Sequence, residues 1–132
     1  MNPKTKKIIR YQMPAILWAI MIFFATSIPS KYLPSQSLLA FDKLIHFTLF
    51  FIFGILIYRA LQPVDDTNPK VIPRIFLSIS IVIFYGIMDE FHQEYIPGRT
   101  IDLYDAIADI VGGIAAGIFI YVKYRKSIKN DK

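Results

Sequence analysis

Residues 11–30 read YQMPAILWAIMIFFATSIPS, a run without a single Asp, Glu, Lys, Arg or His residue. At about 1.5 Å per residue, an α-helix of this length covers the hydrocarbon core of a bilayer, which is about 30 Å thick. Three further apolar runs follow, at residues 44–58, 75–88 and 106–122. These runs are shorter, so they reach spanning length only if polar residues at one end of each lie at the membrane boundary. The pattern predicts four membrane-spanning helices.

The composition agrees with this interpretation. Of 132 residues, 55% are apolar and 19% are charged, and mean hydropathy is +0.44. A soluble four-helix bundle needs a polar face on each helix, whereas residues 49–53 and 81–84 are apolar all round. The absence of cysteine excludes disulfides, Cys zinc sites and thiol nucleophiles. We therefore expect an all-α integral membrane four-helix bundle, a single domain over residues 1–132. Its transmembrane helices are predicted at about 12–29, 43–61, 72–91 and 103–122.

The basic residues predict the orientation of this bundle. All but three of the 15 Lys and Arg residues lie before the first run, between the second and third runs, or after the fourth. Such segments face the cytoplasm, so both termini are predicted to be cytoplasmic, with residues 62–73 as a flexible cytoplasmic connection. This distribution accounts for the net charge of +5 without a nucleic-acid partner. The bilayer is the expected partner.

The acidic residues are distributed in the opposite way. All but three of the ten fall at the predicted outer face of the membrane. These are Asp42, Asp89, Glu90, Glu94, Asp102, Asp105 and Asp109. Seven carboxylates at one face of a small membrane protein predict a site there.

Two segments place polar side chains at the outer ends of helices. Asp42 and His46 are one turn apart, so they share a helix face, although Asp42 alone is equally explained as a helix cap. His46 lies inside an otherwise uncharged span, where a polar side chain is costly and usually functional. Asp89 and Glu90 lie at a helix C-terminus, where acids oppose the helix dipole and need a cation, an arginine or a shared proton. We expect the residues just beyond them, His92 and Glu94, to lie in a solvated loop.

The last apolar run carries a polar stripe. Asp102, Asp105 and Asp109 recur at spacings of three and four, and Gly112, Gly113, Ala116 and Gly117 continue the same face. Small residues at this spacing allow helices to approach closely, so the stripe and its acids are predicted to face the bundle interior. Gly54 and Gly86 are candidate points of approach on the neighbouring helices. Arg99, after the turn Pro97-Gly98, either binds an anionic ligand or pairs with an acid to hold its loop closed.

These motifs, taken in order, resemble the VanZ family. The matching elements are D-K-x-x-H at 42–46, D-E-x-x-Q at 89–93, P-G-R at 97–99, and an Asp followed by Asp-x-x-G at 109–112 before a small-residue helix. The family carries Asn as well as Asp at the position of Asp109. The namesake of the family is a teicoplanin-resistance membrane protein. The resemblance implies a multi-pass protein of the bacterial cytoplasmic membrane, linked to the susceptibility of the cell envelope to glycopeptides, without an established reaction.

The residues and the resemblance together predict an outward-facing polar pocket that binds or modifies an anionic, lipid-linked envelope precursor such as a polyprenyl phosphate. His46 would be the general acid or base, and Arg99 with Lys43 would hold the anion. The catalytic role is assigned to His46, Asp89, Glu90 and Asp105, and substrate binding to Asp42, Lys43, Gln93, Arg99 and Asp109. The acids would orient His46 or hold a divalent cation, the candidate cofactor. The metal and the oligomeric state stay open.

Two other functions fit the same sequence. A small proton-coupled transporter would use the acids as a relay, but none lies in residues 11–30 and none lies deeper than Asp109. A non-catalytic shield or partner protein of the envelope would use the same acids only to stabilise its outer loops.

Overall fold

The computed structural model describes residues 1–33, 39–62 and 70–130, and these are helical apart from the connecting turns. In chain order the elements are α1 (Pro3–Lys7), a π-helical turn η1 (Ile8–Gln12), α2 (Met13–Thr26), a 3₁₀ turn η2 (Ser30–Tyr32), α3 (Leu39–Ala60), α4 (Val71–Gln93) and α5 (Leu103–Asn130). Within the described ranges, four stretches are long and apolar enough to cross a membrane: Thr5–Thr26, Phe41–Ala60, Val71–Gln93 and Leu103–Asn130. The predicted all-α membrane bundle is confirmed. Most of the connection expected at 62–73, namely 63–69, lies outside the described residues.

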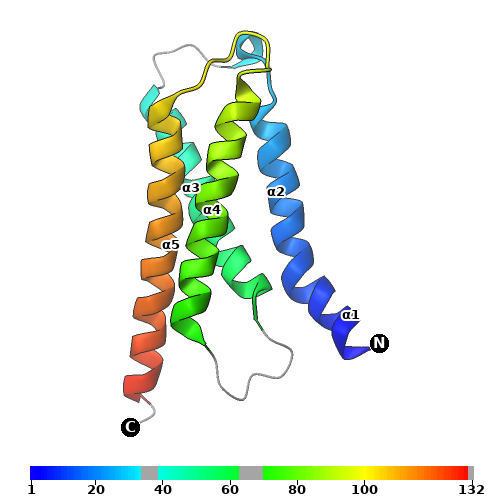
Figure 1. Ribbon diagram of the computed structural model, residues 1–132, viewed down its shortest axis with the longest axis vertical. Helices are drawn as coiled ribbons and strands as arrows, with labels where there is room; N and C mark the ends of the chain where they lie inside the picture. Colours follow the sequence, from blue (N-terminus) through cyan, green and yellow to red (C-terminus); the bar gives the residue numbers. More distant parts are fainter. Residues whose placement is uncertain (34–38, 63–69, 131–132) are drawn as a thin grey trace.

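Helices α3, α4 and α5 lie side by side, and α2 packs against α3 and α4. Toward its N-terminus α2 diverges from α4 and α5, while the preceding turn η1 still contacts α3 (Figure 1). Helix α1 and the C-terminal end of α5 lie at the same end of the bundle (Figure 1). At the opposite end α2 and α4 finish while α3 and α5 begin, and we call this the polar end. The residues expected at the outer face lie there.

The first and last helices extend beyond the predicted spans. Helical structure begins at Pro3 and passes through η1 into α2, with Pro14 in the first turn of α2. Because Pro14 has no backbone N–H, it cannot donate to the preceding turn, and the wider π-helical turn falls at that point. At the other terminus α5 continues to Asn130, so Lys123, Arg125, Lys126 and Lys129 belong to a helix.

Small residues bring the backbones of α3 and α5 together. Gly112, Gly113, Ala116 and Gly117 are buried on one face of α5, as the sequence predicts. A Cβ atom added to Gly54 of α3 would lie 2.7 Å from the Cβ of Ala116, closer than two carbon atoms can approach. This contact holds α5 against α3, so the acids one and two turns above Gly112 face the interior.

The apolar core lies immediately below these acids. Ile22, Phe50, Phe53 and Val82, from α2, α3 and α4, form a buried cluster. Two interhelical hydrogen bonds attach α2 to this core, from the Trp18 indole to the Leu49 carbonyl (3.0 Å) and from the Tyr85 hydroxyl to the Ala19 carbonyl (2.7 Å). The α2 helix is thereby held in register with α3 and α4, and this register places its last turn at the polar end.

Candidate functional site

The polar end contains a buried set of polar side chains that we call the buried cluster. Its members are Thr26, His46, Asp89, Glu90, Gln93, Asp105 and Asp109, drawn from α2, α3, α4 and α5. Among the buried polar residues of the described ranges, only Ser78 lies away from this end, and its hydroxyl donates to the Gly54 carbonyl. The cluster therefore stops at the level of Asp109, and apolar and small residues fill the interior below it.

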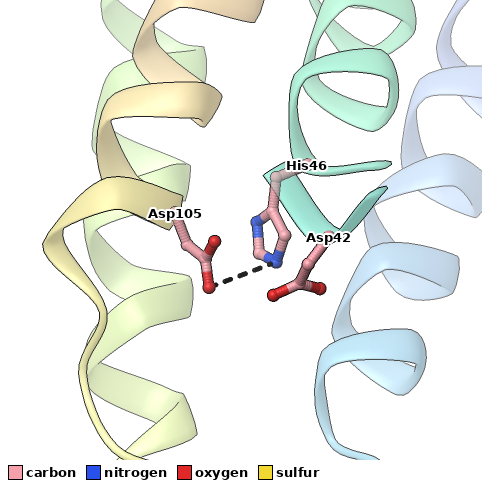
Figure 2. A group of neighbouring side chains, drawn as sticks. All are labelled: Asp42, His46 and Asp105. Atoms are coloured by element: carbon pink, nitrogen blue, oxygen red, sulfur yellow. Dashed lines mark ion pairs between the residues drawn. The ribbon is translucent and has the colours of Figure 1, made fainter. Parts of the chain in front are cut away.

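His46 lies between two carboxylates of α5. Its Nδ1 forms a hydrogen bond of 2.9 Å with Oδ1 of Asp109, and its Nε2 lies 3.9 Å from Oδ2 of Asp105. Figure 2 shows the imidazole between α3 and α5, with the Asp42 carboxylate also near its Nε2 edge. An imidazole between two carboxylates can accept a proton at one nitrogen and release one at the other, which is the requirement for general acid–base chemistry.

Lys43 forms the partly exposed rim of the site. Its ammonium group donates to Asp105 and, at 2.6 Å, to Asp102, and it lies 3.9 Å from Asp42. The Lys43 side chain is 27% exposed and that of Asp102 is 37% exposed, whereas Asp105 is buried. Lys43 therefore connects the solvent-facing rim with the buried cluster. Partial burial acts to raise the pKa of Asp102, but the hydrogen bond and charge of Lys43, with the Tyr104 backbone N–H, outweigh it and hold that pKa below its ordinary value.

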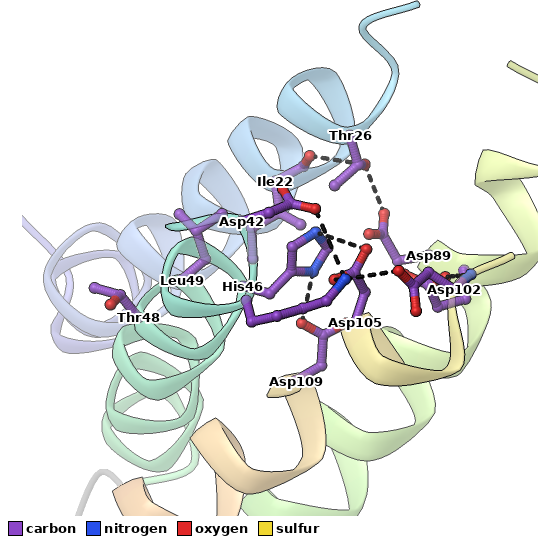
Figure 3. Close-up of polar contacts among 12 residues, drawn as sticks. Ile22, Thr26, Asp42, His46, Thr48, Leu49, Asp89, Asp102, Asp105 and Asp109 are labelled. Carbon is purple, nitrogen blue, oxygen red and sulfur yellow. Dashed lines mark hydrogen bonds and ion pairs between the residues drawn. The ribbon is translucent and has the colours of Figure 1, made fainter. Parts of the chain in front are cut away.

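The α4 acids are held by a separate set of contacts, drawn in part in Figure 3. The Gln93 amide donates to Glu90 (3.1 Å) and to Asp89 (3.3 Å), and the Asp102 backbone N–H donates to Glu90 (3.0 Å). The Thr26 hydroxyl of α2 donates to the other oxygen of Asp89 (2.8 Å). Gln93 thus joins two adjacent acids, and the C-terminal turn of α4 is tied to both α2 and α5.

Asp109 is the deepest member of the cluster, with 0% of its surface exposed. Its Oδ1 bonds to His46, but its Oδ2 has no hydrogen-bond partner among the described residues. That oxygen faces α4 at Gly86, since a Cβ atom on Gly86 would lie 3.4 Å from it. An unpartnered buried carboxylate oxygen is costly, so this atom is a candidate ligand atom.

Two groups of side chains have the geometry to hold a metal ion. In one, Asp42, His46 and Asp105 each offer a ligand atom within 4.8 Å of the others, and in the second, Glu90 and Asp109 do so with the same histidine. The first group is partly exposed at Asp42 and lies beside the Lys43 ammonium, while all three members of the second group are buried.

Arg99 lies outside the buried cluster. Its Nε donates to the backbone carbonyl of Ile28 at 3.3 Å, and within the described residues no ion pair joins it to Asp89 or Asp105. The preceding Gly98 has φ of +76°, and the Ser30 N–H bonds to the Pro97 carbonyl (3.3 Å). Arg99 thus ties the turn after α4 to the end of α2 through a carbonyl, without pairing with an acid.

Two contacts at the polar end are not predicted by the sequence. The contact of Thr26 with Asp89 is one of them; its sequence signal is a hydroxyl in the last turn of an apolar run, at the level of the acids. His92 was expected in a solvated loop, but it lies in the last turn of α4, stacks on Phe23 (ring centroids 4.4 Å apart) and bonds to the Ser27 hydroxyl at 2.9 Å. The Phe23 ring of α2 covers His92. The spacing of residues within one helix does not reveal a neighbour from another helix.

The order of these elements and motifs matches a known protein family. The VanZ/LLP1 family profile matches residues 9–125, which include all of the second and third spans, most of the first and last, and every residue of the buried cluster. The chain belongs to the VanZ/LLP1 family. No curated protein and no solved structure shows significant similarity to it. Family membership and four apolar spans together make this VanZ/LLP1 member a multi-pass membrane protein.

Proposed function

We propose that this VanZ/LLP1 protein lies in the bacterial cytoplasmic membrane with both termini in the cytoplasm. There it binds the anionic headgroup of a lipid-linked envelope precursor, such as a polyprenyl phosphate, from the outer leaflet. The observation that carries the proposal is the combination at the polar end of a partly exposed lysine side chain, Lys43, with a buried imidazole, His46, between two carboxylates. The ammonium supplies an anion-binding group at the membrane boundary, and the imidazole supplies proton transfer behind it.

The charge distribution supports the orientation. Within the described residues, the three basic side chains at the polar end are Lys31, Lys43 and Arg99, whereas those beyond the other end of the bundle include Lys6, Lys7, Arg10 and four on α5 after residue 122. Cytoplasmic segments of membrane proteins carry the basic excess, so the polar end faces outward.

Single cysteines test the orientation directly, because the chain contains no cysteine of its own. Glu94→Cys lies at the polar end, and Ser127→Cys lies near the end of α5. A membrane-impermeant maleimide applied to intact cells should label Glu94→Cys at once and Ser127→Cys only after permeabilisation. The reverse pattern contradicts the proposed topology.

Headgroup binding is tested with the purified chain in nanodiscs. Polyprenyl phosphate should bind more tightly than phosphatidylglycerol, and Lys43→Gln should weaken its binding by about tenfold or more because a charge-assisted hydrogen bond is lost. Lys31→Gln is the matched control, since Lys31 is an exposed lysine at the same end that lies over the Tyr32 ring. Equal binding of both lipids, unaffected by Lys43→Gln, would refute headgroup recognition.

The link to glycopeptides is tested in cells. Expression of the chain in a susceptible bacterium should lower its susceptibility to teicoplanin, and His46→Gln should abolish this effect while the protein still inserts. A protein that acts only as a shield predicts instead that function and thermal stability in detergent fall together in His46→Gln and Arg99→Lys. Loss of function in His46→Gln at unchanged stability supports the proposed chemical role of the imidazole.

A further inference from the structure

The buried cluster contains more negative than positive groups. Glu90, Asp105 and Asp109 approach His46 from α4 and α5, while the one lysine nearby, Lys43, is already bonded to Asp102 and Asp105 at the rim. Below that rim, His46 is the only basic side chain among the described residues that contacts Glu90 and Asp109. Buried carboxylates persist when they are paired or when they coordinate a metal ion. In the lower part of the cluster, the described residues thus set one basic side chain, His46, against Glu90 and Asp109.

A second observation points to the same place. Oδ2 of Asp109, which is completely buried, has no hydrogen-bond partner in the part of the chain that the structure describes. It faces α4 at Gly86, one turn from Glu90 on the same face of that helix. The unpartnered oxygen therefore lies beside the face of α4 that carries Glu90, within the group formed by His46, Glu90 and Asp109.

We propose that His46, Glu90 and Asp109 bind a divalent transition-metal ion. Their candidate ligand atoms lie within 4.8 Å of one another, one from each of α3, α4 and α5. Two ligand atoms at right angles on an ion, each about 2.1 Å from it, are about 3.0 Å apart. The distance of 2.9 Å between Nδ1 of His46 and Oδ1 of Asp109 thus suits two ligands of one ion, and the unpartnered Oδ2 belongs to the same carboxylate.

The contacts around His46 and Glu90 would hold these two side chains in position as ligands. With Nδ1 on the ion, the Nε2–H of His46 points to Asp105, whose Oδ2 lies 3.9 Å away, so this carboxylate would orient the ring. Glu90 is oriented by the Gln93 amide and the Asp102 backbone N–H. One imidazole with two carboxylates favours Mn²⁺, Fe²⁺ or Zn²⁺ over Mg²⁺ and Ca²⁺, which prefer oxygen ligands alone.

This inference rests on the proposed function, because the ion would offer its remaining positions to the headgroup phosphate. It also removes an electrostatic difficulty of that function, since an anion would otherwise enter a site lined by carboxylates. The ion offsets part of their charge and gives the phosphate oxygens a cation to bind.

The test uses the full chain in detergent, stripped of metal with a chelator, and Mn²⁺ as the probe. Titration followed by electron paramagnetic resonance should show one tightly bound Mn²⁺ per chain. Zn²⁺ should displace it, and an equal concentration of Mg²⁺ should not. Pulsed spectra of the wild-type complex should show coupling to an imidazole nitrogen, and this coupling should be lost in His46→Gln. Absence of tight binding, or tight binding without nitrogen coupling, overturns the proposal even if every variant misfolds.

Variants then separate ligation from general attraction of cations. Glu90→Gln and Asp109→Asn should weaken Mn²⁺ binding by about tenfold or more, and Gln93→Met, which removes the support of Glu90, by about tenfold. Glu94→Gln removes an equal charge from an exposed position at the same end and should leave binding unchanged. If Glu94→Gln weakened Mn²⁺ binding as much as Glu90→Gln does, the binding would reflect surface attraction only, and the site would be refuted.

Polyprenyl phosphate binding, measured with and without Mn²⁺, distinguishes the two proposals. Binding that strengthens with Mn²⁺ supports both. Lipid binding that is undiminished in the stripped protein, together with no tight Mn²⁺ binding, overturns the metal site alone. Tight Mn²⁺ binding with nitrogen coupling but without lipid binding supports the metal site and contradicts the proposed headgroup function.

Discussion

Replacing Gly112 by alanine tests the helix contact that supports the site. A Cβ atom at this position would lie 2.5 Å from the carbonyl oxygen of Phe47 and 3.1 Å from the backbone nitrogen of Phe51, both in α3. Ordinary contact begins near 3.4 Å, so α3 and α5 must separate by roughly 0.9 Å at this point. Both obstructing atoms belong to a helix backbone, and no side-chain rotation relieves the overlap.

The expected cost follows from this overlap. Overpacking of a well-packed interior costs about 1–3 kcal/mol, so a central value of about 2 kcal/mol lowers the folding equilibrium roughly thirtyfold. Alanine also has a higher helix propensity than glycine, by about 1 kcal/mol in water, which offsets part of this loss.

Gly117→Ala is the matched control. It has the same gain in helix propensity, but its Cβ atom would first meet Cδ1 of Ile79, the end of a flexible side chain, at 2.6 Å. In SDS titration or thermal unfolding in detergent, Gly112→Ala should be less stable than Gly117→Ala by about 1–3 kcal/mol. Equal stability of the two variants would refute the interpretation that backbone contact fixes the spacing of α3 and α5.

The same substitution should also affect the site. Phe47 follows His46 in α3, and Gly112 lies one turn below Asp109 in α5, so separation at Gly112 lengthens the 2.9 Å contact between His46 and Asp109. Headgroup binding or the cellular phenotype should therefore weaken in Gly112→Ala and persist in Gly117→Ala.

Three further predictions concern individual contacts at the polar end. Thr26→Val leaves one oxygen of Asp89 without its hydrogen-bond donor and should lower the free energy of unfolding in detergent by about 1–3 kcal/mol. The control is Thr48→Val, at an exposed position whose hydroxyl bonds only within its own helix, and it should change the free energy of unfolding little. Because the pKa of Asp102 is lowered in the folded chain, its contribution to stability is complete above the ordinary value of 3.8 and is lost as pH falls through the lower folded value. The melting temperature of the wild type should thus fall more steeply below about pH 4 than that of Asp102→Asn, and parallel curves would contradict the ion pair with Lys43. Gly98→Ala places a side chain at φ of +76° and a Cβ atom 2.1 Å from the Ser30 hydroxyl oxygen, so it should cost more than about 1 kcal/mol. Adding Ser30→Gly should restore only part of this loss, and full restoration would contradict the backbone strain.

Much of the site could be predicted because its residues follow helical spacing. Asp105 and Asp109 share a face with Gly112, and the expectation that this face is buried is confirmed. The sequence places His46 within an otherwise uncharged span, and in the structure its side chain is buried. Spacing within a helix did not specify the partners across helices: Lys43 bonds to Asp102 and Asp105, and Arg99 bonds to a backbone carbonyl. The expectation that these two side chains hold an anion stays a prediction.

The amino-acid sequence by itself determined the number of spans and the gathering of acids at one end, because length, hydropathy and helical period are local properties of the chain. Only the tertiary structure decided which side chains meet. The rotation and register of each helix depend on backbone contacts such as Gly112 with Phe47 and on anchors such as Tyr85 with Ala19. These nonlocal contacts place Thr26 on Asp89 and leave one oxygen of Asp109 facing α4, and no spacing within a single helix specifies either result.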